Sequence, residues 1–282
     1  MPGAPDPLYV AARRVLLDAL QAVRGHLEAL VLVGSQAVYI HSGEIDLAVA
    51  PYTTDGDLAI DPNQLGPEPV LETALTAAGF GQRPDVVGIW HRSIEVSGEV
   101  RSVTVDLLVP DSLGGRGRRG ARIPPHGKQV ARKVVGLEAT LVDRDRRNIA
   151  ALDPGDDRRF DIWIAGPAGL LVAKIHKIRE RVTSRDRTSD KDALDVYRLL
   201  RAVSTVELAH RVRGLLGSRL SRDATMVAIE QLPRLFGSPT ALGCQMATRS
   251  AAQAVDATTL AASLVALTED LLGALASSAA GG

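Results

Sequence analysis

Two aspartates placed two positions apart, Asp55 and Asp57, are the residues of this chain best suited to bind a metal ion. Side chains at positions i and i+2 of a β-strand lie on the same face, so these carboxylates would repel each other unless a cation lies between them. Mg²⁺ favours such oxygen ligands and usually completes its coordination shell with water and substrate phosphates. The spacing therefore predicts a Mg²⁺ site on a strand.

A third aspartate, Asp106, lies between Val105 and Leu107 in an apolar segment. A carboxylate in such surroundings is costly unless it is paired or binds a metal. If the strands carrying the three aspartates are neighbours, their carboxylates could converge on one or two Mg²⁺ ions. Such a site suits in-line attack on an α-phosphate, because the ions stabilise both the attacking and the leaving oxygen.

The dipeptide Gly34-Ser35 follows a short apolar run at residues 29–33. The run predicts a buried strand, the glycine a tight turn, and Ser35 the N-cap of a helix that ends near Gly43. Free backbone N–H groups and a hydroxyl at a helix N-terminus form a natural phosphate site.

Each of these motifs also has a purely structural interpretation. Asp-Gly is a hairpin signal, Gly-Ser often does no more than connect a strand to a helix, and Asp106 could be a charge that protects an edge strand. In the second half, Lys174 and Asp192 lie in a segment so rich in charge that solvated ion pairs would explain it. The combination of motifs, rather than any one of them, favours nucleotide chemistry.

Hydrophobic periodicity predicts the elements that position these residues. We expect strands at 29–33, 55–61, 102–110 and within 133–142, and helices at 8–28, 35–43 and 67–78. From Pro167 onward the pattern is helical, with helices at 167–182, 188–202, 204–215, 222–234 and 257–277. This indicates an α/β domain at 1–160 followed by an all-helical domain at 161–282.

Charge is unevenly distributed along a chain whose net charge is zero. Residues 1–100 carry 13 acidic and 5 basic side chains, whereas residues 112–150 carry 10 basic and 3 acidic ones. The Gly/Arg-rich segment 114–133 is either an exposed, mobile flap or an element that contacts RNA phosphates. In the second case the contacting side chains are Arg116, Arg118, Arg119, Arg122 and Lys128.

Composition excludes several classes of protein. Aromatic residues make up 3% of the chain, which disfavours the aromatic stacking of bases used by RRM or OB modules. The single cysteine, Cys244, permits neither an internal disulfide nor a Cys-rich zinc site, and we expect it to be a core residue. Without a signal-peptide h-region or an unbroken run of 18 apolar residues, the chain is expected to be cytoplasmic, with no membrane span.

Taken together, Gly34-Ser35, Asp55-x-Asp57 and Asp106 on a later strand resemble the pattern of the DNA polymerase β-like nucleotidyltransferases. Within that superfamily, LVGSQAVYIHSG and YTTDGDLAI resemble the AbiEii/MenT-type toxins of toxin–antitoxin systems, which show a glycine turn, a helix and a T-x-D-x-D-L strand. The resemblance continues through residues 170–200, where a helix lysine, Lys174, precedes a (K/R)D-x-x-D helix containing Asp192 and Asp195.

The resemblance implies an α/β fold with a mixed sheet flanked by helices and an all-helical C-terminal domain. It also implies Mg²⁺-dependent transfer of a nucleotide from an NTP, for some members onto the 3′ end of tRNA, and an antitoxin protein as partner. Gly34, Ser35 and Lys174 would bind the nucleotide, Asp55, Asp57 and Asp106 would bind metal, and Asp192 would be the later acid. The active site would lie between the two domains.

Two other functions remain open from the sequence. A nucleotidyltransferase acting on a small polycation, as the aminoglycoside enzymes do, would suit the acidic first third of the chain. A non-catalytic homologue would be favoured by loss of a carboxylate, but all three are present.

Overall fold

The computed structural model describes residues 5–43, 52–182, 190–251 and 254–277. The chain forms two compact units, and each is assembled from segments that are separated in the sequence. The first, here the sheet unit, comprises residues 1–37, 50–134 and 144–165. The second, here the helical unit, comprises residues 38–49, 135–143 and 166–282.

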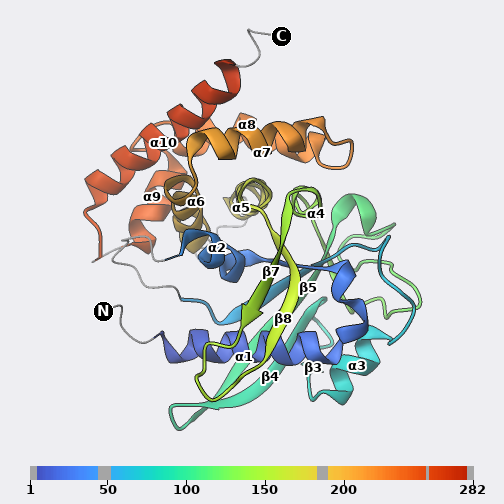
Figure 1. The fold of residues 1–282 in the computed structure, drawn as a ribbon. Helices are drawn as coiled ribbons and strands as arrows, with labels where there is room; N and C mark the ends of the chain where they lie inside the picture. Colours follow the sequence, from blue (N-terminus) through green and yellow to red (C-terminus); the bar gives the residue numbers. More distant parts are fainter. Residues whose placement is uncertain (1–4, 44–51, 183–189, 252–253, 278–282) are drawn as a thin grey trace. The chain divides into compact units, whose positions relative to one another are not determined.

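The sheet unit is built on a mixed sheet in the order β3-β4-β5-β2-β1-β8-β7, with β6 paired to β5. Three pairs are parallel, namely β1 with β8, β2 with β5, and β5 with β6. The predicted α/β class, a mixed sheet flanked by helices with a helical C-terminal region, is confirmed (Figure 1). The strands in the described part of the chain are β1 (Leu30–Val33), β2 (Asp55–Ile60), β3 (Gly81–Gln82), β4 (Ile89–Val96), β5 (Glu99–Pro110), β6 (Arg132–Val134), β7 (Arg144–Ala150) and β8 (Arg159–Ala165).

Helix α1 (Pro7–Ala22) lies along one face of this sheet and contacts β2, β4 and β5 (Figure 1). Its start is fixed by Asp6, whose side chain accepts hydrogen bonds from the first-turn N–H groups, and by Pro7 at a position that needs no donor. The predicted helix at 8–28 is too long, because the chain tightens into a 3₁₀ segment at Arg24–Ala29. Gly25 lies in that segment, and glycine weakens a helix interior.

Segment 133–142 was expected to be a strand, and this is wrong for most of its length. Only β6 is extended, and the chain then forms the short helix α4 (Glu138–Val142). Gly136 turns the chain with a φ of 89°, and its N–H donates to Glu138 Oε2 at 2.9 Å. A glycine at positive φ breaks a strand in a way that apolar residues on both sides conceal. The predicted helix at 67–78 is likewise shorter and forms α3 (Leu71–Ala77).

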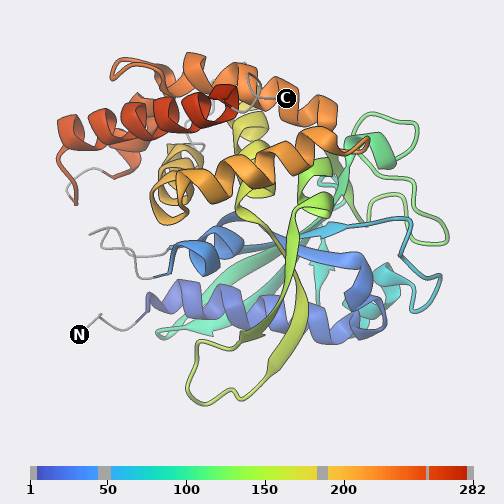
Figure 2. The ribbon, with the colours of Figure 1, turned by 45° about the horizontal axis from the view of Figure 1, so that its top comes forward.

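The helical unit contains α4 and a bundle in which α5 contacts α4, α6, α7 and α8. Helix α10, red in Figure 2, packs against α6, α7, α8 and α9. Cys244 is fully buried, as predicted for a core residue. The predicted helices from Pro167 onward are confirmed, although residues 188–189 of one lie outside the described residues. The helices from Pro167 onward are α5 (Pro167–Val182), α6 (Asp190–Ala202), α7 (Thr205–Gly217), α8 (Arg222–Phe236), α9 (Leu242–Ser250) and α10 (Ala257–Ser277). Helix α2 (Gly34–Ser42) begins in the sheet unit.

Helix α10 differs from the expectation that no segment could span a membrane. Among the described residues it is the one helix long and apolar enough to do so, judged by length and composition. Its buried side chains include Leu260, Leu264 and Leu271, which recur at helical spacing along one stripe. That stripe faces its neighbours in the helical unit.

The predicted domain boundary at 160/161 falls inside β8, whereas the long segment of the helical unit begins at Gly166. Strand β8 pairs with both β1 and β7, so its residues belong to the sheet. The division into domains at 1–160 and 161–282 stays a prediction.

Candidate active site

Strands β2 and β5 place the three predicted aspartates on one face of the sheet. The two strands pair in parallel, with Asp57 opposite Asp106 and Asp55 opposite Thr104. Paired residues and residues two apart share a face. The expectation that these strands are neighbours is therefore confirmed. The opposite face is the one covered by α1, where Gly56 lies against Leu16.

The pKa of Asp106 is strongly perturbed. The residue is 7% exposed, and burial together with the charges of Asp57 and Asp55 raises its pKa to about 7, although Arg132 opposes the change. Arg132 Nη2 donates to Asp106 Oδ2 at 2.9 Å. A carboxyl with this pKa exchanges its proton near neutral pH, which is the property required of a general base.

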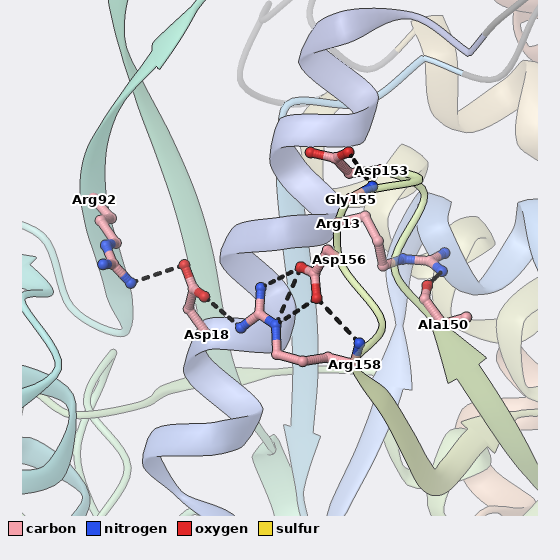
Figure 3. A network of polar contacts seen from close by, with 8 residues as sticks. All are labelled: Arg13, Asp18, Arg92, Ala150, Asp153, Gly155, Asp156 and Arg158. Carbon is pink, nitrogen blue, oxygen red and sulfur yellow. Dashed lines mark hydrogen bonds and ion pairs between the residues drawn. The ribbon is translucent and has the colours of Figure 1, made fainter.

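Asp55 is supported by two buried residues that the sequence analysis missed. Its carbonyl oxygen accepts a hydrogen bond from Gln36 Nε2 at 2.9 Å, and Gln36 Oε1 accepts one from Arg13 Nε at 2.8 Å. Arg13 also donates to the carbonyl of Ala150 at 2.9 Å (Figure 3). The Thr53 hydroxyl donates to the Asp55 carboxylate. An arginine on the apolar face of the first helix was the sequence signal for this network.

The turn at Gly34 fits closely against Asp57. Gly34 has a φ of 69°, and a Cβ at this position would lie 1.9 Å from Asp57 Oδ2. Conformation and space therefore both require glycine here. Helix α2 begins at Gly34, so Ser35 is not the N-cap but lies, buried, within the first turn. The N-terminal N–H groups of this helix are thus beside one of the predicted metal ligands.

The oxygen donors present on this face suit Mg²⁺, which proteins commonly hold by one or two carboxylates together with water and substrate phosphates. Asp55 and Asp57 could provide that pair. Within residues 5–43, 52–182, 190–251 and 254–277, however, no three His, Cys, Asp or Glu side chains are arranged to hold a metal ion in common. A set of metal ligands that includes Asp106 stays a prediction.

A second charged network holds α1 to the sheet on the face opposite the carboxylates. Asp18 accepts from Arg92 at 2.8 Å and from Arg158 at 2.6 Å, and Arg158 also pairs with Asp156 (Figure 3). These contacts join α1 to β4 and to the connection between β7 and β8. They fix the scaffold behind the site and give no sign of a ligand.

The segment at 114–131 contains neither helix nor strand, but its backbone is anchored. Trp90 Nε1 donates to the carbonyl of Val130 at 3.0 Å, and His126 Nδ1 accepts from the N–H of Leu71 at 3.2 Å. His126 thereby ties this segment to the start of α3. The five basic side chains predicted to contact RNA are all exposed, namely Arg116, Arg118, Arg119, Arg122 and Lys128. In the described part of the chain, none of them forms an ion pair.

Lys174 and Asp192 belong to the helical unit and are not solvated surface residues, so that structural alternative is wrong. Lys174 is 3% exposed, and its Nζ donates to Asp192 Oδ1 at 2.7 Å and to Asp195 Oδ2 at 2.6 Å. Burial lowers the pKa of Lys174, but the two carboxylates outweigh burial and hold it above its ordinary value. This cluster links α5 to α6, and its predicted role with nucleotide phosphates stays a prediction.

No protein-family model, no curated protein and no solved structure matches this chain. Its function is therefore inferred from the residues and geometry described above.

Proposed function

We propose that this chain is a Mg²⁺-dependent nucleotidyltransferase, which transfers a nucleotide from an NTP to an acceptor hydroxyl. The observation that carries the proposal is the register of β2 and β5, which pairs Asp57 with Asp106 beside the N-terminus of α2. Asp55 and Asp57 hold the metal ion, and the start of α2 at Gly34 and Ser35 binds the β- and γ-phosphates. Bound Mg²⁺ would neutralise phosphate charge and stabilise the leaving oxygen.

In this proposal Asp106 acts as general base on the acceptor hydroxyl. In the metal-free chain, burial and the charges of Asp57 and Asp55 raise its pKa to about 7, which favours uptake of the proton from the hydroxyl. The Arg132 guanidinium limits how far that pKa rises, because it stabilises the ionised form.

The acceptor in this proposal is the 3′ end of tRNA. The anchored segment 114–131 presents five exposed basic side chains that have no acidic partner among the described residues, which suits contact with a phosphate backbone. Together with the motif order, this supports a toxin of the AbiEii/MenT type, acting in the cytoplasm and neutralised by an antitoxin protein.

The test is incubation of the purified protein with total tRNA, Mg²⁺ and each of the four α-³²P-labelled NTPs. We expect label on tRNA with at least one NTP, and none with the Asp55→Ala/Asp57→Ala variant. Asp85→Ala, which removes an exposed carboxylate of the same unit, is the matched control and should retain labelling. Label on an added aminoglycoside but not on tRNA would replace the acceptor, and absence of transfer to either would reject the proposed activity.

A further inference from the structure

Arg132 places a positive charge directly beside Asp106. Strand β6 pairs in parallel with β5 and places Arg132 opposite Leu108. Leu108 and Asp106 are two residues apart, so Arg132 emerges on the carboxylate face. Its Nη2 donates to Asp106 Oδ2 at 2.9 Å. Its Nε is buried and has no hydrogen-bond partner among the described residues.

The backbone around Arg132 is built to keep it there. Gly88 has a φ of 78°, and a Cβ on it would lie 2.6 Å from the backbone amide nitrogen of Arg132. Gly120 forms an isolated bridge to Arg132 from the other direction. Gly88 therefore allows its chain segment to approach the backbone of Arg132 closely, and the bridge from Gly120 fixes that backbone from the other side.

The charge of Arg132 also opposes a second metal ion at Asp106. A second ion in a two-metal site would lie about 3.5–4 Å from the first and would share Asp106 with the guanidinium, at a distance where like charges repel.

We propose that Arg132 takes the place of a second metal ion, so that the site binds a single divalent cation held by Asp55 and Asp57. This inference rests on the proposed metal site. The side-chain geometry agrees with it, because Asp106 is engaged by Arg132 and the described residues contain no preformed set of three carboxylates. Arg132 is then a positioning residue, which fixes Asp106 and sets the number of ions.

The experiment is a titration of the full chain with Mn²⁺ at pH 8, with free Mn²⁺ measured by electron paramagnetic resonance. We expect one Mn²⁺ per chain for the wild type and for Arg132→Lys, which keeps the charge. In Arg132→Gln the first Mn²⁺ should bind about tenfold more tightly, because a nearby positive charge has been removed, and a second ion should bind. Arg83→Gln is the matched control, because it breaks an exposed Arg–Asp pair in the same unit and should behave as the wild type.

The wild-type stoichiometry decides the matter even if a variant fails to fold, which tryptophan fluorescence would reveal. Two Mn²⁺ per wild-type chain would overturn this inference and leave the metal site standing. Equal affinity and stoichiometry in wild type and a folded Arg132→Gln would also overturn it. No Mn²⁺ bound to the wild type would reject the proposed metal site, and this inference with it.

Discussion

Replacing Asp106 with asparagine should stabilise the metal-free protein, and by more at high pH than at low pH. Burial and the charges of Asp57 and Asp55 raise the pKa of Asp106 from 3.8 to about 7 in the folded chain. Between these values the folded state binds the proton that the unfolded state has released. The free energy of unfolding of the wild type therefore falls as pH rises through this window. Asparagine, similar in shape and always neutral, avoids that loss.

The size of the effect follows from the shift. One pKa unit corresponds to about 1.4 kcal/mol, so the variant should gain about 2 kcal/mol at pH 5 and about 4 kcal/mol at pH 8. The difference between the two pH values, roughly 2–3 kcal/mol, is the quantity to measure, because structural effects of the substitution that do not depend on pH cancel.

Urea denaturation followed by tryptophan fluorescence provides the assay. The chain has two tryptophans, Trp90 and Trp163, and both lie in the sheet unit, so fluorescence reports on the unit that contains Asp106. EDTA should be present to remove metal ions. Asp85→Asn is the control, and as a change at an exposed side chain it should alter the free energy of unfolding by less than about 0.5 kcal/mol at either pH.

A gain that is equal at pH 5 and pH 8 would refute this reasoning. It would mean that Asp106 is ionised in the folded protein at both pH values, and that Arg132 outweighs burial and the neighbouring carboxylates. A loss of stability at pH 8 would refute it more strongly, because the ion pair with Arg132 would then be a net stabilising contact.

Three further predictions concern glycine, amide and lysine side chains. Gly34→Ala should lower Mn²⁺ affinity at least tenfold in a titration, because its Cβ would displace Asp57. Gly43→Ala is the control, because Gly43 also has a positive φ but lies in open space. It should cost only about 1 kcal/mol in stability and leave Mn²⁺ affinity unchanged. Gln36→Met should lower the urea midpoint of tryptophan fluorescence by the equivalent of about 1–3 kcal/mol, because it leaves buried polar groups unpaired, and an unchanged midpoint would contradict this. Lys174→Met should destabilise the helical unit by about 3–5 kcal/mol at pH 7, measured by far-UV circular dichroism, because it leaves two buried carboxylates without their cation, and an unchanged stability would contradict this.

The parts of the fold that depend on short stretches of sequence were predictable. The alternation around Asp106 located β5, the helical periodicity after Pro167 located the bundle, and Gly34 marked the turn between β1 and α2. In each case the signal lies within one element, where side-chain spacing and backbone preference act directly. Strands β4 and β7 were missed because their exposed faces carry charge and interrupt the apolar pattern.

The candidate site itself was only half determined by the sequence. The spacing of Asp55 and Asp57 fixed their common face, but only the pairing of β2 with β5 brought Asp106 opposite Asp57. The partnership of Arg132 with Asp106 depends on β6 lying beside β5.

The burial of Lys174 could not be inferred either, since a charge-rich helix has the same sequence pattern whether its ions face water or one another. Its two carboxylate partners come from the next helix along the chain, 18 and 21 residues away. A sequence states which charges are available at each position, whereas tertiary structure decides which of them meet, because their energies depend on distances and solvent exclusion that arise only when the elements pack.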